Sequence, residues 1–481
     1  MLDACDTESP REACGVVGVC APATTEVGRI CFYALFQLQH RGQESAGISV
    51  GDGVTTTTHK RLGLVTQVFD EKIVSGFRGH VAVGHTRYST TGSNVECNTQ
   101  PIQGHFRGTP FVLAHNGNLV NSMELRAELE AEGMRFGTTV DSELIVRLIE
   151  SMDAPNIEAA VKACLSRIRG AYSLVIGTPS QVMGIRDPWG VRPLCLGELP
   201  GHGGHILASE TCAFPPLGAH FLRELEPGEC VTLDESGLRA EQVEPLQARA
   251  MCLFEFVYFA RPDTTMYGTS LWQVRRRMGN LLAREHPADA DIVIPVPDTA
   301  YPAAVGYAEE SRIPYMEGLV KNRYIQRTFI QPEQSMRELG VRLKLAPLRE
   351  NLLGRRVVVV DDSIVRGTTT LQQVKLLRDA GAVEVHLRIT SPPVKFPCYY
   401  GIDMAVQSDL IAHRMNVEKI RAHLGADSLG FLSLSNTVRA VGVNKEHLCR
   451  ACFDGRYPCE VPEPFRVTKL ALDPSATLAG E

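Results

Sequence analysis

The sequence predicts a protein of two docked parts, a strand-rich α+β first half and an α/β second half. Up to about residue 246, short apolar runs such as those in GHVAVGHTRYST and AYSLVIG alternate with Gly and Thr turns, which is typical of strands. Beyond residue 250, the segments DIVIPV, RRVVVVDD and VEVHLRI carry Val- and Ile-rich runs separated by helical stretches such as LQQVKLLRDAG. Such runs between helices indicate strands buried on both faces of a parallel sheet.

Two amphipathic helices are expected in the first half, near 122–133 and 141–150, where apolar residues recur every three or four positions. Strands with few helices predict sheets that are covered on one face by another sheet and on the other by helices. No low-complexity linker lies near residue 246, so we expect a domain over 14–246 packed against a second over 247–481.

Composition points to a folded protein with small-molecule partners. Charged residues make up 22% of the 481 residues, and a net charge of -6 gives no electrostatic reason to expect nucleic acid or an anionic membrane as a partner. The acidic start MLDACDTESPRE is unlike a secretory signal, and no run approaches the ~18 apolar residues of a membrane span. We therefore expect a cytoplasmic protein, in which the 14 cysteines serve as thiols, catalysts or metal ligands rather than disulfides.

The strongest single motif is VVVVDDSIVRGTTT at 357–370. A buried strand ends in Asp361 and Asp362 and is followed by a small-residue turn that opens a helix. Ligands of open α/β sheets bind at such strand ends, where helix N-termini attract phosphates, and the two acids suit the hydroxyls of a sugar. An ordinary helix cap would account for one acid and Ser363, but not for the second acid and the Arg-Gly-Thr-Thr-Thr run.

This motif resembles the phosphoribosyl pyrophosphate motif of type I phosphoribosyltransferases. The resemblance implies that the acids hold the ribose and that the turn holds the 5-phosphate, through Ser363, Arg366, Gly367, Thr368 and Thr369. A second strand end, IVIPVPDTAYPAA, matches the family's pyrophosphate loop, which implies Asp298 nearby and a Mg²⁺ site formed with Thr299, Asp361 and Asp362. The basic stretch 321–345 resembles the family's closing loop, with candidate pyrophosphate clamps at Lys321, Arg323, Arg342 and Lys344.

The first half resembles the glutaminase domain of class II amidotransferases, an N-terminal-nucleophile hydrolase fold with an αββα sandwich. The matching segments are ACGVVG, LQHRGQESAGI, HTRYSTTGS, AHNGNLVN and TTVDSELI. In this family the nucleophile is a cysteine whose own α-amine accepts the thiol proton, and an amine held in a peptide bond has no such basicity. We therefore predict that residues 1–13 are a propeptide whose removal leaves Cys14 first.

The same resemblance assigns the rest of the glutamine site. Arg87 is expected to hold the α-carboxylate of glutamine, and Asp141 its α-ammonium. The side-chain amide of Asn116 and the backbone amide of Gly117 are the family's oxyanion donors. Taken singly, the Asn-Gly pair makes a good turn and Asp141 makes a good helix cap. The assignment of a glutamine site therefore depends on all these residues occurring together in the order found in the family.

A glutaminase followed by a phosphoribosyltransferase resembles the glutamine phosphoribosylpyrophosphate amidotransferase family, which catalyses the committed first step of purine synthesis. The resemblance implies a thioester at Cys14, internal transfer of ammonia, and its displacement of pyrophosphate from carbon 1 of the ribose. The aromatic segment CLFEFVYFARPDTTMYG matches the family's junction between domains and is a candidate lining of the ammonia route. By resemblance only, purine nucleotides are feedback inhibitors and the protein is a homotetramer.

The family's iron–sulfur subgroup carries four thiolates in contexts that recur here. They imply a structural [4Fe-4S] cluster on Cys252, Cys398, Cys449 and Cys452. The spacing of the CxxC pair does not itself identify a metal, so zinc on the same thiolates stays open, with Cys459 and His447 as nearby donors.

Two other functions remain as alternatives. Glucosamine-6-phosphate synthase would share the glutamine site but should lack VVVVDDSIVRGTTT, which is present. A regulatory protein that uses the phosphoribosyl fold as a sensor needs no glutaminase and usually carries a basic DNA-binding element. Neither alternative fits the whole chain.

Overall fold

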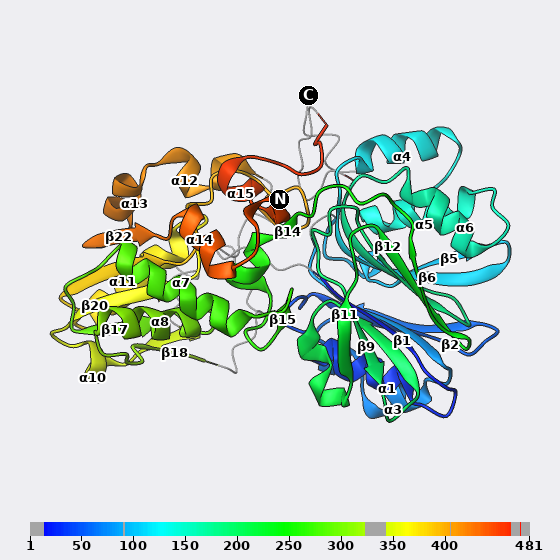
Figure 1. The fold of residues 1–481 in the computed structure, drawn as a ribbon, viewed down its shortest axis with the longest axis horizontal. Helices are drawn as coiled ribbons and strands as arrows, with labels where there is room; N and C mark the ends of the chain where they lie inside the picture. Colours follow the sequence, from blue (N-terminus) through cyan, green and yellow to red (C-terminus); the bar gives the residue numbers. More distant parts are fainter. Residues whose placement is uncertain (1–13, 90–91, 323–342, 405, 463–471, 473–481) are drawn as a thin grey trace.

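The computed structural model describes residues 14–89, 92–322, 343–404, 406–462 and 472, and these form two lobes side by side (Figure 1). The predicted propeptide, residues 1–13, and the stretch 323–342 of the predicted closing loop lie outside the described residues. Among the described residues, no helix is both long and apolar enough to cross a bilayer.

Two antiparallel sheets form the first half. In spatial order, the first contains β11 (His220–Glu224), β9 (Cys195–Leu199), β10 (Gly204–Ala208), β1 (Gly15–Cys20), β4 (Val81–Arg87), β2 (Ser45–Gly51) and β3 (Thr56–Leu62). The second contains β13 (Gly237–Gln242), β12 (Glu229–Asp234), β8 (Val182–Arg186), β7 (Gly170–Gly177), β6 (Thr109–Leu119) and β5 (Ile102–Phe106).

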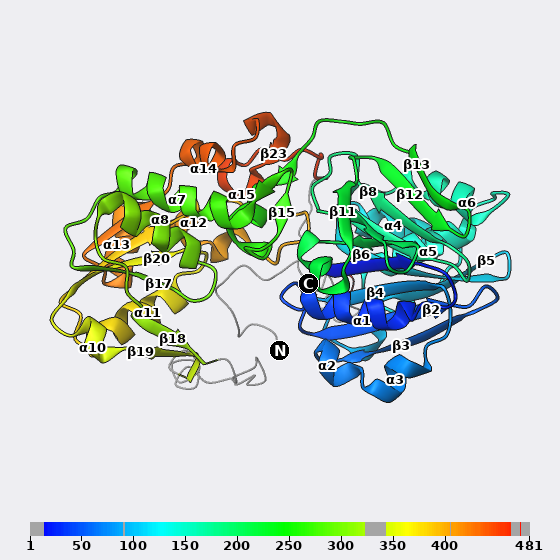
Figure 2. The ribbon, with the colours of Figure 1, turned by 60° about the horizontal axis from the view of Figure 1, so that its bottom comes forward.

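Alternating side chains fix the layers of this half. On β1, Val16 packs into the core between the two sheets, whereas Val17 packs outward beneath a helix. The helices over the first sheet are α1 (Val27–Gln37), α2 (Val65–Val68) and α3 (Glu71–Gly76), with α1 along β1 and β4 (Figure 2). Those over the second sheet are α4 (Ser122–Ala131), α5 (Asp141–Ser151) and α6 (Ile157–Leu165). The result is the predicted αββα sandwich, with more helices than the two that the sequence pattern indicated.

The second half is built on a four-stranded parallel sheet in the order β17 (Ile292–Pro295), β20 (Arg356–Asp361), β21 (Glu384–Ile389) and β22 (Ser428–Phe431). Val358 and Val360 face a core shared with α7 (Leu271–Glu285) and α8 (Tyr301–Ser311). Val357 and Val359 face the opposite core, which α11 (Thr368–Asp379) and α13 (Val417–Leu424) cover. Burial on both faces explains the continuous valine run that predicted this strand.

Smaller elements complete this half. They are β14 (Met251–Cys252) paired with β23 (Leu448–Cys449), the hairpins β15 (Thr265–Met266) with β16 (Thr269–Ser270) and β18 (Leu319–Lys321) with β19 (Leu345–Pro347), a π-helix (Glu255–Phe259), and α10 (Arg349–Leu352), α12 (Ile411–Arg414), α14 (Leu434–Val441) and α15 (Ala451–Asp454). The predicted boundary near residue 246 falls between β13 and β14.

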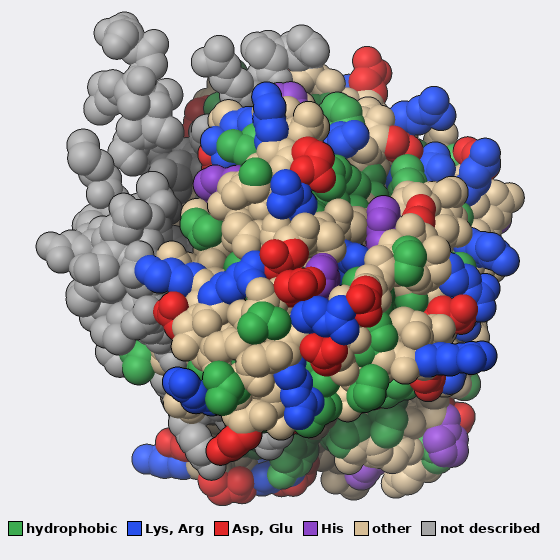
Figure 3. All heavy atoms as spheres, turned by 90° about the vertical axis from the view of Figure 1, so that its left-hand side faces the viewer, with side chains coloured by type: hydrophobic (Ala, Val, Ile, Leu, Met, Phe, Trp, Pro, Cys, Tyr) green, Lys and Arg blue, Asp and Glu red, His purple; other side chains and the backbone are tan. Residues whose placement is uncertain are grey.

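Basic and acidic side chains are interspersed over the face of the second half that Figure 3 shows. No single sign of charge dominates that face, in keeping with the small net charge of the sequence.

Candidate functional sites

Cys14 directly precedes β1 in the middle of the seven-stranded sheet. Its Sγ lies 3.3 Å from the carbonyl oxygen of Tyr88 and 3.5 Å from the Tyr88 amide nitrogen. Its own carbonyl accepts a hydrogen bond of 3.2 Å from Arg41 Nε. Burial raises the pKa of the Cys14 thiol to about 12. Since a protonated thiol is a poor nucleophile, catalysis at this position requires an adjacent base.

Arg87 ends β4 and is almost fully buried beside Cys14, whose thiol it influences electrostatically. Its Nη1 lies 3.9 Å from Glu44 Oε2, and the same Glu44 carboxylate accepts a hydrogen bond of 2.9 Å from the Ser89 amide. Burial, which outweighs the nearby carboxylates, lowers the pKa of this guanidinium. Glu44 therefore places a carboxylate beside the guanidinium of Arg87, the cation that the sequence predicts for this site.

Asp141 is the first residue of α5, and its Oδ2 accepts a hydrogen bond of 3.0 Å from the Leu119 amide at the end of β6. Its Oδ1 lies 3.6 Å from Nδ1 of His115. Burial favours the neutral acid, but His115 and the backbone hydrogen bonds outweigh it and lower the pKa of Asp141. A buried anion and a buried cation thus act on the same cysteine, an arrangement that matches the two charged ends of an amino acid.

Asn116 and Gly117 lie on β6, in register with Ser173 and Tyr172 of β7. Asn116 is fully buried, and neither atom of its side-chain amide makes a hydrogen bond within the described residues. Gly117 has a φ of +150°, and a Cβ there would lie 1.9 Å from the carbonyl oxygen of Ala171. Because a buried amide without partners is costly to the fold, Asn116 is a candidate for contact with a ligand.

Residues that the sequence reasoning did not single out support this site. Arg41 and Glu44 lie within the quoted segment LQHRGQESAGI, and His115 directly precedes Asn116. These three residues lie in the matched segments, but only the three-dimensional structure shows which side chains they contact.

A buried ion-pair network joins the two halves. Arg41 pairs with Glu210 at 2.5 Å and with Glu255 at 2.7 Å, and Glu255 also accepts from Arg192 at 3.1 Å. All four side chains are almost fully buried. Glu255 begins the π-helix within the aromatic segment, so the junction between the domains is linked to the backbone carbonyl of Cys14 through Arg41.

The acid pair lies at the carboxyl end of β20, as the sequence predicts. Asp361 is the last residue of the strand, and Asp362 accepts hydrogen bonds from the hydroxyls of Ser363 and Thr299. Burial and the neighbouring Asp362 raise the pKa of Asp361 well above its ordinary value. Burial also raises the pKa of Asp362, although Arg275 opposes it. Such a buried pair is suited to a ligand that brings hydroxyl donors or a cation.

The turn after these acids opens α11. Gly367 has a φ of +91° and precedes Thr368, the first helical residue, followed by Thr369. The Arg366 guanidinium lies 3.2 Å from Asp409. Free N–H groups at the start of a twelve-residue helix are a suitable place for a phosphate.

The basic candidates are only partly within the described residues. Lys321 ends β18 and pairs with Asp298, and both side chains are largely exposed. The carbonyl of Lys344 accepts a hydrogen bond of 2.8 Å from the Asn322 amide, so residues 322 and 344, near the two ends of the predicted closing loop, lie next to each other. Arg323 and Arg342 lie outside the described residues.

The four predicted cluster cysteines belong to, or pack against, the core that both halves share. Cys252 and Cys449 are paired across β14 and β23, and Cys452 lies on α15. Every pair among these three and Cys398 interacts electrostatically, and burial raises the pKa of Cys252 to about 11. Within the described chain, no three Cys, His, Asp or Glu are gathered as a group for a single metal ion.

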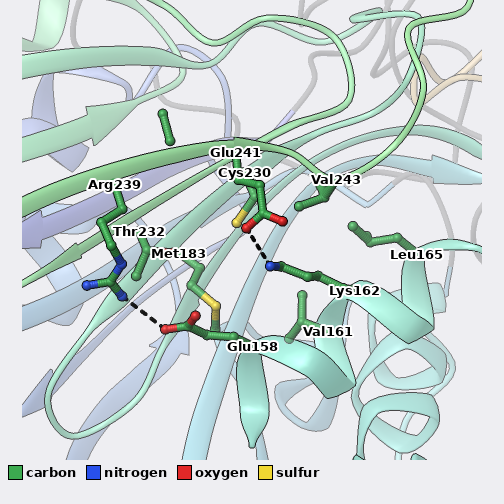
Figure 4. A pocket seen from close by; sticks show the side chains of 11 residues that line it. Glu158, Val161, Lys162, Leu165, Met183, Cys230, Thr232, Arg239, Glu241 and Val243 are labelled. Carbon is green, nitrogen blue, oxygen red and sulfur yellow. Dashed lines mark hydrogen bonds and ion pairs between the residues drawn. The ribbon is translucent and has the colours of Figure 1, made fainter.

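A separate cavity of about 230 Å³ lies between α6 and strands β12 and β13 (Figure 4). Ion pairs of Lys162 with Glu241 and of Arg239 with Glu158 span its polar edge. Its lining contains none of the predicted site residues.

Comparisons with known proteins agree with both halves. A family model described as a glutamine amidotransferase domain matches residues 85–216. The chain is 49% identical to an amidophosphoribosyltransferase of Synechococcus elongatus, over 97% of this chain and 95% of that protein. It is 47% identical to the amidophosphoribosyltransferase of Methanothermobacter thermautotrophicus, over 94% of this chain and 96% of that protein.

Solved structures are similar over nearly the whole chain. The glutamine phosphoribosylpyrophosphate amidotransferase of B. subtilis, complexed with ADP and GMP, has a TM-score of 0.88 and 43% identity, with 94% of this chain and 98% of that chain covered. A structure of the allosteric regulatory enzyme of purine biosynthesis has a TM-score of 0.89 and 43% identity, with 94% and 97% covered.

Proposed function

The chain belongs to the amidophosphoribosyltransferase family, and from that premise we propose how its own residues carry out the two half-reactions. Glutamine is hydrolysed in the first half, and the ammonia released displaces pyrophosphate from 5-phosphoribosyl 1-pyrophosphate in the second. The observation that carries the proposal is the gathering of Cys14, Arg87 and Asp141 in one buried site, with a second site at Asp361 and Asp362.

The glutamine half-reaction begins at Cys14. Once residues 1–13 are removed, the freed α-amine takes the thiol proton, and Sγ attacks the amide carbon of glutamine bound by Arg87 and Asp141. Collapse of the adduct releases ammonia and leaves a thioester, which water hydrolyses to glutamate. The raised pKa of the uncut residue supports the need for that base.

Asn116→Ala should lower kcat for glutamine about 100- to 1000-fold, because it removes an oxyanion donor. Thermal stability should change little, since the Asn116 amide makes no hydrogen bond in the described structure. Initial rates and thermal unfolding would measure both effects.

Asn121→Ala is the matched control. Asn121 is also buried, but its amide bonds to the backbone of Arg167 and Arg169 at 2.9 Å each. Its loss should lower the unfolding temperature and leave kcat within a few-fold. If both variants lost only stability, the oxyanion assignment of Asn116 would be wrong.

In the second half, Asp361 and Asp362 accept the ribose hydroxyls, and the turn of Ser363, Arg366, Gly367, Thr368 and Thr369 holds the 5-phosphate. Carboxylate and hydroxyl oxygens of Asp361, Asp362 and Thr299 are donors that suit Mg²⁺. Bound Mg²⁺ would neutralise charge on the departing pyrophosphate. Lys321 and Arg323 are proposed to hold the same group.

The route between the sites is proposed to run beside the aromatic segment. Phe254, Phe256 and Phe259 belong to a buried core that also contains Val120 and Ala171 of the first half. An apolar boundary of this kind keeps water from competing with ammonia.

We further propose a structural [4Fe-4S] cluster on Cys252, Cys398, Cys449 and Cys452. The donor set fits, because the buried thiols of Cys252, Cys449 and Cys452 and the partly buried thiol of Cys398 lie close together: burial and then these neighbouring thiols raise the pKa of Cys449 and Cys452. Ionised together without a metal, they would repel one another, whereas a cluster compensates their charge.

Protein purified without oxygen should contain about four irons per chain, and Cys449→Ser should lose most of them together with the visible absorbance. Cys459→Ser is the control, since Cys459 is buried nearby against Tyr400 yet outside the proposed ligand set, and its variant should keep the iron. One zinc per chain and no visible absorbance would mean that these thiolates hold zinc and not an iron–sulfur cluster.

The B. subtilis relative was solved with ADP and GMP, which supports regulation of this chain by purine nucleotides. We propose such inhibition, a homotetramer and a cytoplasmic location as properties of the family. Light scattering tests the oligomeric state, and addition of ADP with GMP to the assay tests the inhibition.

The experiment that tests the whole proposal is glutamine-dependent pyrophosphate release from phosphoribosyl pyrophosphate and Mg²⁺, on anaerobically purified protein. Release that requires both substrates supports the coupled reaction. No release from protein that begins at Cys14 would contradict it.

A further inference from the structure

A loop of the second half packs on the candidate oxyanion residues of the first half. The loop contains Gly401, whose φ is +97°. A Cβ built on Gly401 would lie 2.9 Å from the carbonyl carbon of Gly117, 3.0 Å from its oxygen and 3.1 Å from its Cα. These are backbone atoms, which cannot rotate aside as a flexible side chain does. Only a glycine therefore fits between this loop and β6 without displacing one of them.

Hydrogen bonds from the first half anchor the loop next to this contact. Asn118 Nδ2 donates to the carbonyl oxygen of Tyr399 at 3.1 Å. Arg192 Nε donates to the carbonyl oxygen of Tyr400 at 2.8 Å, and Arg192 is itself fixed by its ion pair with Glu255. The two residues directly before Gly401 are thus tied to the glutaminase half, so the contact is not a loose approach of two surfaces.

The other side of Gly117 is closed as well. Gly117 pairs with Tyr172 of β7, and the space toward Ala171 admits no Cβ. The Gly117 peptide is therefore held between β7 and the Gly401 loop. A side chain at position 401 would therefore have to displace either the loop or Gly117, and the packing of Gly117 against β7 leaves that residue little room to move.

We infer that Gly401 is a positioning residue for glutamine hydrolysis: by its lack of a side chain, it sets the orientation of the Gly117 peptide and the neighbouring Asn116 amide toward the oxyanion. This inference rests on the proposed oxyanion roles of those two residues. It places part of the glutaminase machinery under the control of a loop that belongs to the phosphoribosyltransferase half.

The test is Gly401→Ala in the full-length holoenzyme. Because oxyanion donors act mainly in the transition state, kcat for glutamine should fall about 10- to 100-fold, while KM for glutamine stays within about threefold. The ammonia-dependent rate should stay within about twofold, since that reaction does not use the Gly117 amide. Iron content and the visible spectrum are measured in parallel, because Cys398 lies on the same loop.

Gly442→Ala is the matched control. Gly442 has a comparable φ of +83°, and a Cβ added there would meet no heavy atom within 4 Å. It therefore carries the same backbone strain without the contact, and its glutamine kcat should match that of the parent protein. An equal loss in both variants, or an equal loss of both activities in Gly401→Ala, would overturn the inference.

Asn118→Ala provides a second test that leaves Gly401 intact and decides the matter if Gly401→Ala does not fold. Loss of the bond to Tyr399 should lower glutamine kcat about 3- to 10-fold without a change in the ammonia-dependent rate. An unchanged kcat would count against the loop as a positioning device. If the parent protein itself shows no glutamine-dependent reaction, the proposed function fails, and the failure is visible before any variant is made.

Discussion

Cys14→Ala is expected to abolish glutamine-dependent product formation, by roughly 10⁴-fold or more, because it removes the proposed nucleophile that forms the thioester. Product formation with high external ammonia should persist, since the second half binds its substrate without this thiol. Glutamine-dependent and ammonia-dependent pyrophosphate release, measured on the same preparation, separate the two effects.

Cys20→Ala is the control for this prediction. Cys20 ends the strand that Cys14 precedes and is as buried as Cys14, each being 7% exposed. It packs between the two sheets, away from the candidate site, so its loss should cost some stability and no glutamine activity. Equal loss of both activities in Cys14→Ala would contradict the picture of two separate sites.

Asp361→Asn is expected to remove both activities, by about 10²-fold or more, because each depends on the same proposed ribose contacts and their charge-assisted hydrogen bonds. The stability of the folded protein should not fall. The raised pKa of Asp361 means that its charged form is disfavoured in the folded protein, and an amide removes that charge while its oxygen still accepts from the Asp362 amide.

The raised pKa of Asp361 also predicts the direction in which Asp361→Asn changes the stability of the folded protein. A carboxyl whose folded-state pKa lies above its unfolded value makes the folded protein less stable once pH exceeds the unfolded value. Without substrate or Mg²⁺ at neutral pH, the unfolding temperature of Asp361→Asn should therefore equal or exceed that of the parent. Asp289→Asn, at a side chain 90% exposed, should change neither activity nor stability. A markedly lower unfolding temperature for Asp361→Asn would mean that the acid serves the fold.

Patterns local in sequence predicted much of this molecule. The valine run of β20 and the acids at its end are adjacent in the chain, so the strand, the turn and a candidate site could be predicted together. The αββα sandwich and the glutamine residues came from the matched segments. Helix α1 was not predicted, since its sequence VGRICFYALFQ is apolar on most sides and leaves Tyr33 and Phe36 exposed.

The contacts that the sequence did not reveal share one cause, the distance between their residues along the chain. Arg41 and Glu255 are 214 residues apart, and nothing in either segment identifies the other as its partner. The contact of Gly401 with Gly117 is likewise invisible in sequence, because glycines are frequent and most serve turns. Pairings of this kind depend on how the two halves dock, which no local pattern encodes.

The buried network of Arg41, Glu210, Glu255 and Arg192 limits how such proteins can be separated into individual domains. A first half produced alone would lose the Glu255 carboxylate from Arg192 and from one side of Arg41, which keeps its pair with Glu210, and would expose to water the apolar surface that now surrounds them. The halves are therefore poor candidates for exchange as independent modules. A chimera would have to carry over the four residues of this ion-pair network together with the catalytic residues.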